Sequence, residues 1–254
     1  MLEVADVNVD PRHWIGGERV ASADTFEDLS PIDGTVLGQV VRGGQAEADA
    51  AVAAAQDAFP SWARMGARAR GEILHRVADL VEQRLEDFAQ LETRDNGSLL
   101  RSHRRGVMPR VAMNIRFFAE YAVNDLKHPE FETRGHTNVV SWDPAGVTAI
   151  VTPWNAPLML ATWRIGPALA AGDTVVLKPP EWAPLTASLF ADITAEAGMP
   201  PGVFNVVQGI GTEAGAALVS HPGVARIAFT GSVPTAKAVA RAAGFFGAIE
   251  RHAA

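Results

Sequence analysis

Residues 146–181 read GVTAIVTPWNAPLMLATWRIGPALAAGDTVVLKPPE, and this stretch decides the fold. Two short runs of β-branched and apolar residues, 147–151 and 174–177, flank an alanine-rich helical segment at 158–171. Short apolar strands separated by a helix are typical of the unit that places two parallel strands side by side. The pattern therefore predicts a parallel sheet with a helix packed against it.

The same alternation continues toward the carboxyl end. The further segments are a helix at 185–197, a strand at 203–207, a helix at 211–220, a strand at 226–229 and a helix at 233–243. Repeated strand–helix units predict the α/β class, with a doubly wound parallel sheet covered by helices on both faces.

Upstream of residue 146 the chain is predicted to be mainly helical. Apolar side chains recur at helical spacing in 45–59, 67–96 and about 109–123, and Gly97 supplies a left-handed stop after the second of these. Residues 127–141 instead alternate between apolar and polar side chains, which predicts a hairpin or bridging ribbon.

Composition excludes several classes of function. The 254 residues are 48% apolar, carry a formal charge of −7 and include no cysteine. The negative charge opposes binding to nucleic acid or to an anionic membrane surface. Without cysteine there are no disulfides, thiolate metal sites or thiol catalysis, and since no histidine pair has metal-binding spacing we expect no metal. An acidic amino terminus and the lack of an apolar run of about 20 residues predict a cytoplasmic protein.

The polar motifs all follow predicted strands, and in open parallel sheets ligands bind beyond the carboxyl ends of the strands. Thr152-Pro153-Trp154-Asn155 follows the first strand, where the proline pins the turn and the asparagine amide can donate to developing negative charge. The alternative for these residues alone is an asparagine turn with a buried tryptophan.

Lys178 follows the second strand, and Glu181 comes three residues later, after two prolines. An ammonium and a carboxylate held together can bind the two hydroxyls of a ribose. A carboxylate there would repel a 2′-phosphate, which favours NAD over NADP. A surface ion pair that caps a helix is the alternative.

Two more turns open predicted helices. Gly211 and Gly215 belong to a glycine-rich turn whose spacing is one residue longer than the dinucleotide fingerprint. Phe229-Thr230-Gly231-Ser232 ends the fourth strand, where free backbone N–H groups and a hydroxyl suit a pyrophosphate. A tight turn and a plain serine N-cap are the respective alternatives.

Taken in order, the motifs from Thr152 to Ser232 resemble the NAD(P)-dependent aldehyde dehydrogenase superfamily, and the resemblance covers about the first 240 residues. It implies a Rossmann-like cofactor domain beside a catalytic domain, an aldehyde as the small-molecule substrate, and a homo-oligomer for the intact member. Residues 116–122 and 152–157 look most like the branch that oxidises hydroxymuconic and related semialdehydes, or betaine-type aldehydes.

The resemblance also implies residue roles. Asn155 would be the catalytic oxyanion-hole amide, Lys178 and Glu181 the ribose contacts, and Trp154 would lie near the nicotinamide. The cofactor-binding set implied as a whole is Thr152, Pro153, Trp154, Lys178, Glu181, Gly211, Gly215, Phe229, Gly231 and Ser232.

Four segments are expected: an amino-terminal helical part of the cofactor domain at 1–126, a bridging hairpin segment at 127–145, a βα nucleotide-binding region at 146–243 and an atypical tail at 244–254. The family's nucleophilic cysteine and its Glu-Leu-Gly-Gly-Lys general-base motif are absent. We therefore hypothesise an amino-terminal portion of an aldehyde dehydrogenase that does not turn over by itself and is poorly soluble. A non-catalytic protein that binds NAD or docks onto a complete subunit is the competing hypothesis.

Overall fold

The computed structural model describes residues 1–126 and 128–245, and a six-stranded sheet lies at its centre. The strands are ordered β12-β9-β10-β11-β3-β4, and the first four run parallel. These four are β9 (Val147–Val151), β10 (Thr174–Lys178), β11 (Phe204–Val206) and β12 (Arg226–Phe229). The predicted parallel sheet is thus confirmed, and an antiparallel pair extends it.

The antiparallel pair comes from the amino-terminal region, which was predicted to be helical. β3 (His13–Ile15) joins β11 at Val206↔Trp14, and β4 (Glu18–Val20) lies at the sheet edge. Four other short strands form two separate hairpins: β1 (Leu2–Val4) with β2 (Val7–Val9), and β5 (Thr25–Leu29) with β6 (Val36–Val41). The first 41 residues therefore contain strands, and the helices begin after them.

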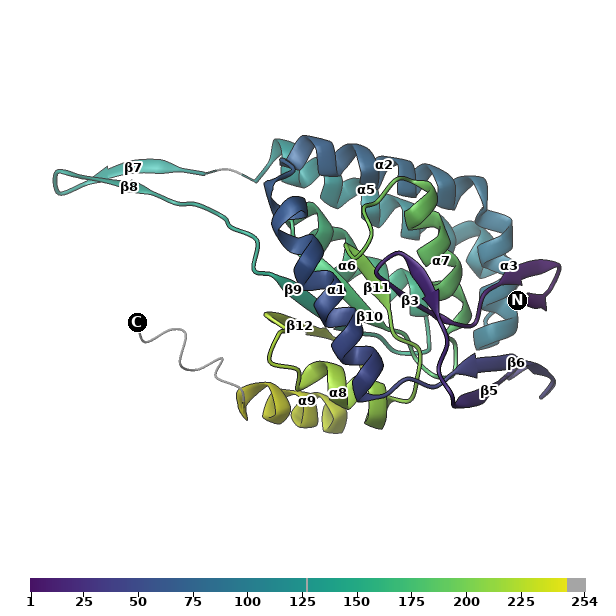
Figure 1. The fold of residues 1–254 in the computed structure, drawn as a ribbon. Helices are drawn as coiled ribbons and strands as arrows, with labels where there is room; N and C mark the ends of the chain where they lie inside the picture. Colours follow the sequence, from purple (N-terminus) through teal and green to yellow (C-terminus); the bar gives the residue numbers. More distant parts are fainter. Residues whose placement is uncertain (127, 246–254) are drawn as a thin grey trace.

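Helices cover both faces of the sheet (Figure 1). One face is packed by α1 and α8, and the other by α6 and α7, with α2 and α5 outside α6. The helices are α1 (Gln45–Arg64), α2 (Ala67–Gln83), α3 (Leu85–Asn96), α4 (Leu100–Ser102), α5 (Met108–Asn124), α6 (Pro157–Ala171), α7 (Leu185–Glu196), α8 (Ala216–Val219) and α9 (Val233–Phe245). Two π-helical turns, η1 (His103–Val107) and η2 (Gly211–Gly215), precede α5 and α8.

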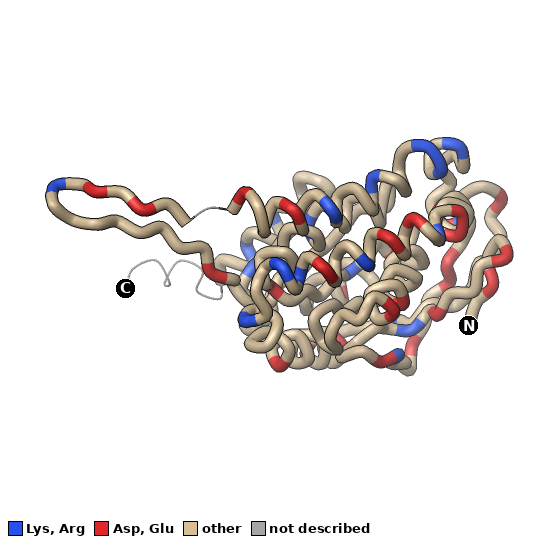
Figure 2. Tube along the Cα trace, turned by 90° about the horizontal axis from the view of Figure 1, so that it is seen from above, with Lys and Arg blue, Asp and Glu red and all other residues tan. Residues whose placement is uncertain are grey.

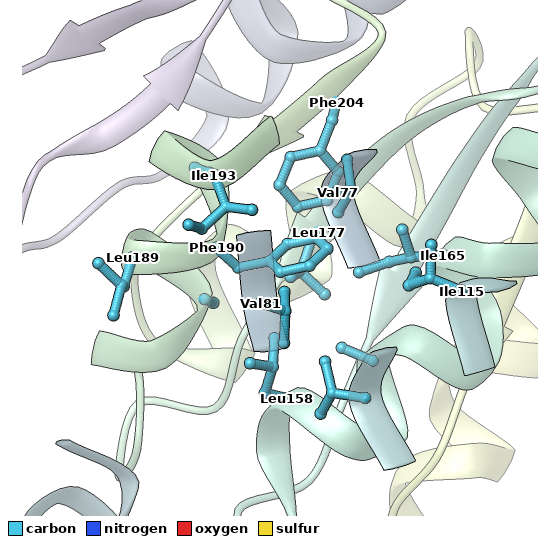
Figure 3. Packing of buried hydrophobic residues seen from close by; sticks show 14 of the residues in the cluster. Val77, Val81, Ile115, Leu158, Ile165, Leu177, Leu189, Phe190, Ile193 and Phe204 are labelled. Atoms are coloured by element: carbon cyan, nitrogen blue, oxygen red, sulfur yellow. The ribbon is translucent and has the colours of Figure 1, made fainter. Parts of the chain in front are cut away.

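The strand side chains divide between two cores because successive residues of a strand face opposite sides of the sheet. In β10, Val175 and Leu177 join the larger core, whereas Val176 joins the smaller core under α1 and α8. Figure 3 shows the larger core, where Val77, Ile165 and Phe190 from three helices converge on the sheet. Both faces of β10 are buried, which explains its continuous apolar sequence.

Two helical predictions need correction. Residues 67–96 form two helices because the backbone of Arg84 leaves the α region at φ −106 and ψ 25. The Arg84 side chain pairs there with Glu196 of α7, the helix against which α3 packs. The first helix also passes Pro60 and ends at Arg64, since Trp62 is buried and its indole N–H donates to the Leu169 carbonyl at 3.1 Å.

The predicted hairpin is confirmed as β7 (Glu130–Thr133) paired with β8 (His136–Val139). It extends away from the body of the molecule, and all its strand residues are exposed except the half-buried Asn138 (Figure 1). Of the segment expected at 127–145, residue 127 lies outside the described residues. Most of the expected tail does too, since the description ends within it at Phe245, the last residue of α9.

Candidate nucleotide-binding site

Strand register brings the predicted motifs to one edge of the sheet. Val151, the last residue of β9, is paired with Lys178 of β10 on one side and with Phe229 of β12 on the other. The Thr230 N–H also donates to the Val151 carbonyl at 3.1 Å. The loops that follow these three parallel strands therefore start side by side, as the strand-end argument predicted.

Lys178 and Glu181 form the central pair of this edge. The Lys178 Nζ donates to the Glu181 Oε2 at 2.8 Å, and the Gly211 N–H donates to Oε1 of the same carboxylate at 3.4 Å. The lysine side chain is 2% exposed and that of Glu181 is 28% exposed. A cation buried to this extent with one partner is not the surface ion pair of the alternative interpretation.

Burial and mutual charge set the protonation of this pair. Burial lowers the pKa of Lys178, and the neighbouring Glu181 charge opposes that shift. Burial also acts to raise the pKa of Glu181, but the Lys178 charge and the hydrogen bonds from Lys178 and Gly211 outweigh it, so the pKa is lowered. Glu181 is therefore an anion that can accept hydrogen bonds.

The glycines of η2 lie against this pair. A Cβ on Gly211 would be 3.7 Å from the Glu181 Oε1, and one on Gly215 would be 3.7 Å from the Lys178 Cδ. Gly209, before the turn, has φ +140, and a Cβ there would lie 2.9 Å from the Gly43 carbonyl oxygen. Glycine at 209 allows the turn to approach residue 43, and the backbone at 211 and 215 packs beside the lysine and the glutamate.

The first motif is exposed at the same edge. Trp154 is 52% exposed and Asn155 is exposed, both in the loop that enters α6 at Pro157. The alternative of a buried tryptophan is therefore wrong. Thr152 is 5% exposed, and its Oγ1 has no hydrogen-bond partner among the described residues.

The fourth motif caps a helix. The Ser232 Oγ accepts from the Thr235 N–H at 3.3 Å, and its carbonyl accepts from the Ala236 N–H at 2.9 Å, which is N-cap geometry for α9. Ser232 and Gly231 are exposed, and a Cβ on Gly231 would lie 2.5 Å from the Phe229 ring. The cap leaves other N–H groups of the first turn open to an anion.

A hollow of about 680 Å³ adjoins Glu181 and Trp154. Its wall also includes Trp182, which is 67% exposed, and residues 27–31 at the end of β5. Sequence reasoning missed Trp182, although a tryptophan directly after the Lys178–Glu181 motif was a usable signal.

Sequence reasoning also missed three buried carboxyl groups behind this hollow. Asp95 accepts from the Leu185 N–H at 2.9 Å at the start of α7, and Glu92 accepts from the Thr186 hydroxyl at 3.0 Å. Burial raises the pKa of Glu92 to about 7 and that of Asp28 to about 6. Burial and the charge of Asp28 raise the pKa of Asp95 well above its usual value. Asp95 and Glu92 therefore hold the start of α7, and burial favours the protonated form of all three carboxyl groups.

Neither the charged side chains nor the potential metal ligands indicate a second site in the part of the chain that the structure describes. Figure 2 shows acidic and basic residues interspersed along the helices. Within residues 1–126 and 128–245, no group of three or more His, Cys, Asp or Glu side chains could hold a metal ion. In the same ranges, no helix has the length and apolar content needed to cross a bilayer.

A doubly wound sheet with a buried lysine–glutamate pair and glycine turns at its carboxyl edge defines a candidate dinucleotide-binding protein. The family model for the aldehyde dehydrogenase family matches residues 19–253. The chain therefore belongs to the aldehyde dehydrogenase family.

Individual relatives support the same family assignment. The chain is 42% identical over 234 residues to 5-carboxymethyl-2-hydroxymuconate semialdehyde dehydrogenase of Escherichia coli, a match that covers 91% of this chain and 50% of that protein. It is 41% identical over 228 residues to 2-aminomuconic semialdehyde dehydrogenase of Homo sapiens, covering 89% of this chain and 47% of the relative. The chain thus spans about half the length of the curated relatives it matches.

Solved structures share the fold. The crystal structure of HpcC from Thermus thermophilus matches with a TM-score of 0.87 and 46% identity, covering 93% of this chain and 46% of that one. Indole-3-acetaldehyde dehydrogenase complexed with NAD+ matches with a TM-score of 0.91 and 38% identity, covering 94% and 49% of the two chains.

Proposed function

We propose that this chain is the NAD-binding part of an aldehyde dehydrogenase, and that the whole protein oxidises an aldehyde to a carboxylic acid. One observation carries the proposal: the buried Lys178–Glu181 pair, with the Gly211 N–H on the same carboxylate, at the carboxyl edge of a parallel sheet. A relative of similar fold was crystallised with NAD+.

The residues present fit a dinucleotide. Glu181 accepts from the ribose hydroxyls and Lys178 donates to them, while the η2 turn at Gly211, which lies against this pair, faces the adenosine end. The first turn of α9 at Ser232 offers N–H groups to the pyrophosphate. Thr152, Pro153, Trp154, Phe229 and Gly231 flank this path from the neighbouring strands.

We propose NAD as the preferred cofactor. Glu181 is anionic because its pKa is lowered, so it repels a 2′-phosphate placed at the ribose. When bound, the nicotinamide ring supplies the hydride acceptor.

Asn155 is the proposed oxyanion donor, because its exposed amide precedes α6 at the same edge. Of the 254 residues none is cysteine, so this chain holds no thiol nucleophile. We therefore expect no dehydrogenase turnover from this polypeptide alone. Absorbance of NADH after mixing pure chain, aldehyde and NAD+ checks this, and NADH formation would contradict it.

Titration calorimetry with NAD+ tests the binding proposal. The chain is expected to bind NAD+, and Glu181→Gln is expected to weaken binding by about tenfold, since hydrogen bonds to a charged group are lost. Glu196→Gln is the matched control, because Glu196 is also an acid paired with a cation but lies on α7 against Arg84. Absence of binding at millimolar NAD+ by a folded chain would overturn the proposal.

For the whole protein we propose a muconic-type semialdehyde as substrate. The support is that relatives about 40% identical carry such names, including 2-hydroxymuconic semialdehyde dehydrogenase of Pseudomonas sp. (strain CF600), 43% identical over 244 residues. Comparing kcat/KM of the whole protein for a carboxylated semialdehyde and an uncharged aldehyde of equal length tests this. Equal values would contradict it.

A second candidate function is docking onto another subunit of the family. The favouring observation is a hollow of about 570 Å³ beside β12, lined by apolar side chains that include Phe118, Trp163 and Ile227. Copurification with a full-length homologue would support docking.

Homo-oligomerisation of the intact protein is proposed as well, because the extended β7–β8 hairpin exposes its strands. Light scattering of the intact protein with and without residues 130–139 checks it, and an unchanged mass would count against it.

A further inference from the structure

An ion pair joins the end of β6 to the η2 turn, whose first residue contacts the proposed ribose carboxylate. Arg42, just after β6, binds the Glu213 carboxylate of η2 through Nε at 2.8 Å and through its terminal amino group at 2.5 Å. Glu213 is two residues after Gly211, whose N–H donates to Glu181. A cation and its neutralising acid therefore flank the same turn that contacts the ribose carboxylate.

Backbone contacts fix Arg42 at this turn. The Gly43 N–H donates to the Gln208 carbonyl at 3.0 Å, and Gly209 has the positive φ that lets it approach Gly43 closely. The Arg42 N–H donates to the Asp24 carbonyl at 2.9 Å. The segment that carries the guanidinium is thus held against the turn, while the Arg42 side chain is 40% exposed and can change partner.

The electrostatics of the pair bear on one group of the ligand. In doubly wound dinucleotide sites an acid binds the ribose 2′-hydroxyl of NAD, whereas a nearby arginine accommodates the 2′-phosphate of NADP. Here the acid is Glu181, and the arginine beside the turn is occupied by Glu213. An exposed ion pair contributes little free energy. The Arg42 side chain can therefore exchange Glu213 for another anion bound nearby.

We propose that the Arg42–Glu213 ion pair is a specificity determinant for the dinucleotide: Glu213 occupies the guanidinium that would otherwise bind a 2′-phosphate, and so favours NAD over NADP. This inference rests on the proposed NAD-binding function. Glu181 disfavours NADP because it repels the 2′-phosphate. The Arg42–Glu213 pair disfavours NADP in a second way, because the guanidinium that would attract the phosphate is already paired.

The test measures dissociation constants for NAD+ and NADP+ by titration calorimetry on the 254-residue chain and its variants. Glu213→Gln is expected to lower the ratio of the NADP+ constant to the NAD+ constant by about tenfold, the size of one charge-assisted hydrogen bond. Adding Arg42→Gln to that variant is expected to restore the original ratio, because the freed guanidinium is gone. Glu213→Ala frees the same group and serves if Glu213→Gln does not fold.

The matched control is Glu196→Gln, which removes the same charge from another exposed arginine pair, Arg84–Glu196, away from the turn. A ratio that falls equally in this control, or that stays low in the double variant, would overturn the specificity proposal in favour of a general charge effect. An unchanged ratio in Glu213→Gln would overturn it too. Failure of the unmodified chain to bind NAD+ would instead overturn the proposed function, so the two failures are distinguishable.

Discussion

The two edges of the central sheet are finished in different ways. At the β4 edge, antiparallel strands from the amino terminus close the sheet, and Asn205 of β11 accepts from the Gly16 N–H at 2.9 Å beneath them. At the β12 edge the last strand is parallel, Arg226 is exposed, and the other residues of the strand are only half-buried. The closed edge is held by buried polar contacts, whereas the β12 edge offers apolar surface. We infer that stability depends on the first edge and association on the second.

The largest expected effect is at the closed edge. Asn205 is fully buried, and its amide also donates to the Gly202 and Val175 carbonyls at 2.7 and 3.2 Å. Asn205→Ala leaves these groups unpaired and is expected to cost about 4 kcal/mol in the free energy of unfolding. Urea denaturation measures this. Asn138→Ala in the exposed hairpin is the control and should lower the free energy of unfolding by less than about 0.5 kcal/mol. Equal losses in the two variants would contradict the inference that stability depends on the contacts of Asn205.

A pH dependence should come from the same edge. His13 of β3 accepts from the Gln208 N–H at 2.9 Å through Nδ1, so its Nε2 donates to Ser22 at 2.7 Å. Burial lowers the pKa of His13 to about 4, although Glu47 opposes the shift. The unfolded chain binds a proton that the folded chain does not, so stability falls as the pH falls from about 6.5 toward 4, by up to about 3 kcal/mol.

Comparison with His13→Gln isolates this contribution. The unfolding free energy of the unmodified chain minus that of the variant should be smaller at pH 4.5 than at pH 7.5. Subtraction removes Glu92 and Asp28, whose raised pKa values act in the opposite direction in this range. A difference that does not vary with pH would exclude the buried neutral histidine.

At the β12 edge the expected effect is on association. Ile227→Lys places a charge in the hollow beside β12 and should reduce concentration-dependent self-association, while lowering the unfolding free energy by only about 1 kcal/mol. Sedimentation velocity at several concentrations checks the first part. Val20→Lys on β4 is the matched control, since Val20 is also half-buried in an edge strand. Equal loss of association in both variants would remove the distinction between the edges.

The smallest effect concerns the ion pair across the β12 edge. Arg226 is 60% exposed, and its guanidinium lies 3.9 Å from the buried Asp173 carboxylate. That carboxylate already accepts from the N–H groups of Ala145 and Gly146. Arg226→Gln is therefore expected to change the unfolding free energy by less than about 0.5 kcal/mol. A thermal melt that drops by many degrees would show that this edge is held more firmly than its exposure indicates.

Local patterns predicted the parallel strands of the central sheet, of which β10 is buried on both faces. The strands at 147–151 and 226–229 were predicted to the residue, because their apolar runs end sharply at Thr152 and Thr230. The strands of the first 41 residues were missed because four of them have only three residues and all six pair in hairpins. β3 also depends on a distant partner, with Trp14 opposite Val206. The break at Arg84 was missed because the apolar stripe continues through it.

The part of the site that lies directly after parallel strands could be predicted from the sequence. Lys178 and Glu181 were placed together because they are three residues apart after a parallel strand, and they are in contact. Arg42 and Glu213 are 171 residues apart, so no local signal joins them. Asp28 shows no sign of burial in the sequence, since it lies in a strand whose other residues are exposed or half-buried.

The buried carboxyl groups behind the site have a thermodynamic consequence of their own. Near pH 6, the raised pKa values of Glu92 and Asp28 mean that the folded chain carries protons which the unfolded chain gives up. Unfolding therefore exchanges protons with the buffer: Glu92 and Asp28 release them, whereas His13 takes one up. The heat of unfolding then includes the heat with which the buffer balances the net exchange. Scanning calorimetry of this protein should accordingly return different apparent enthalpies in phosphate and in an amine buffer at one pH.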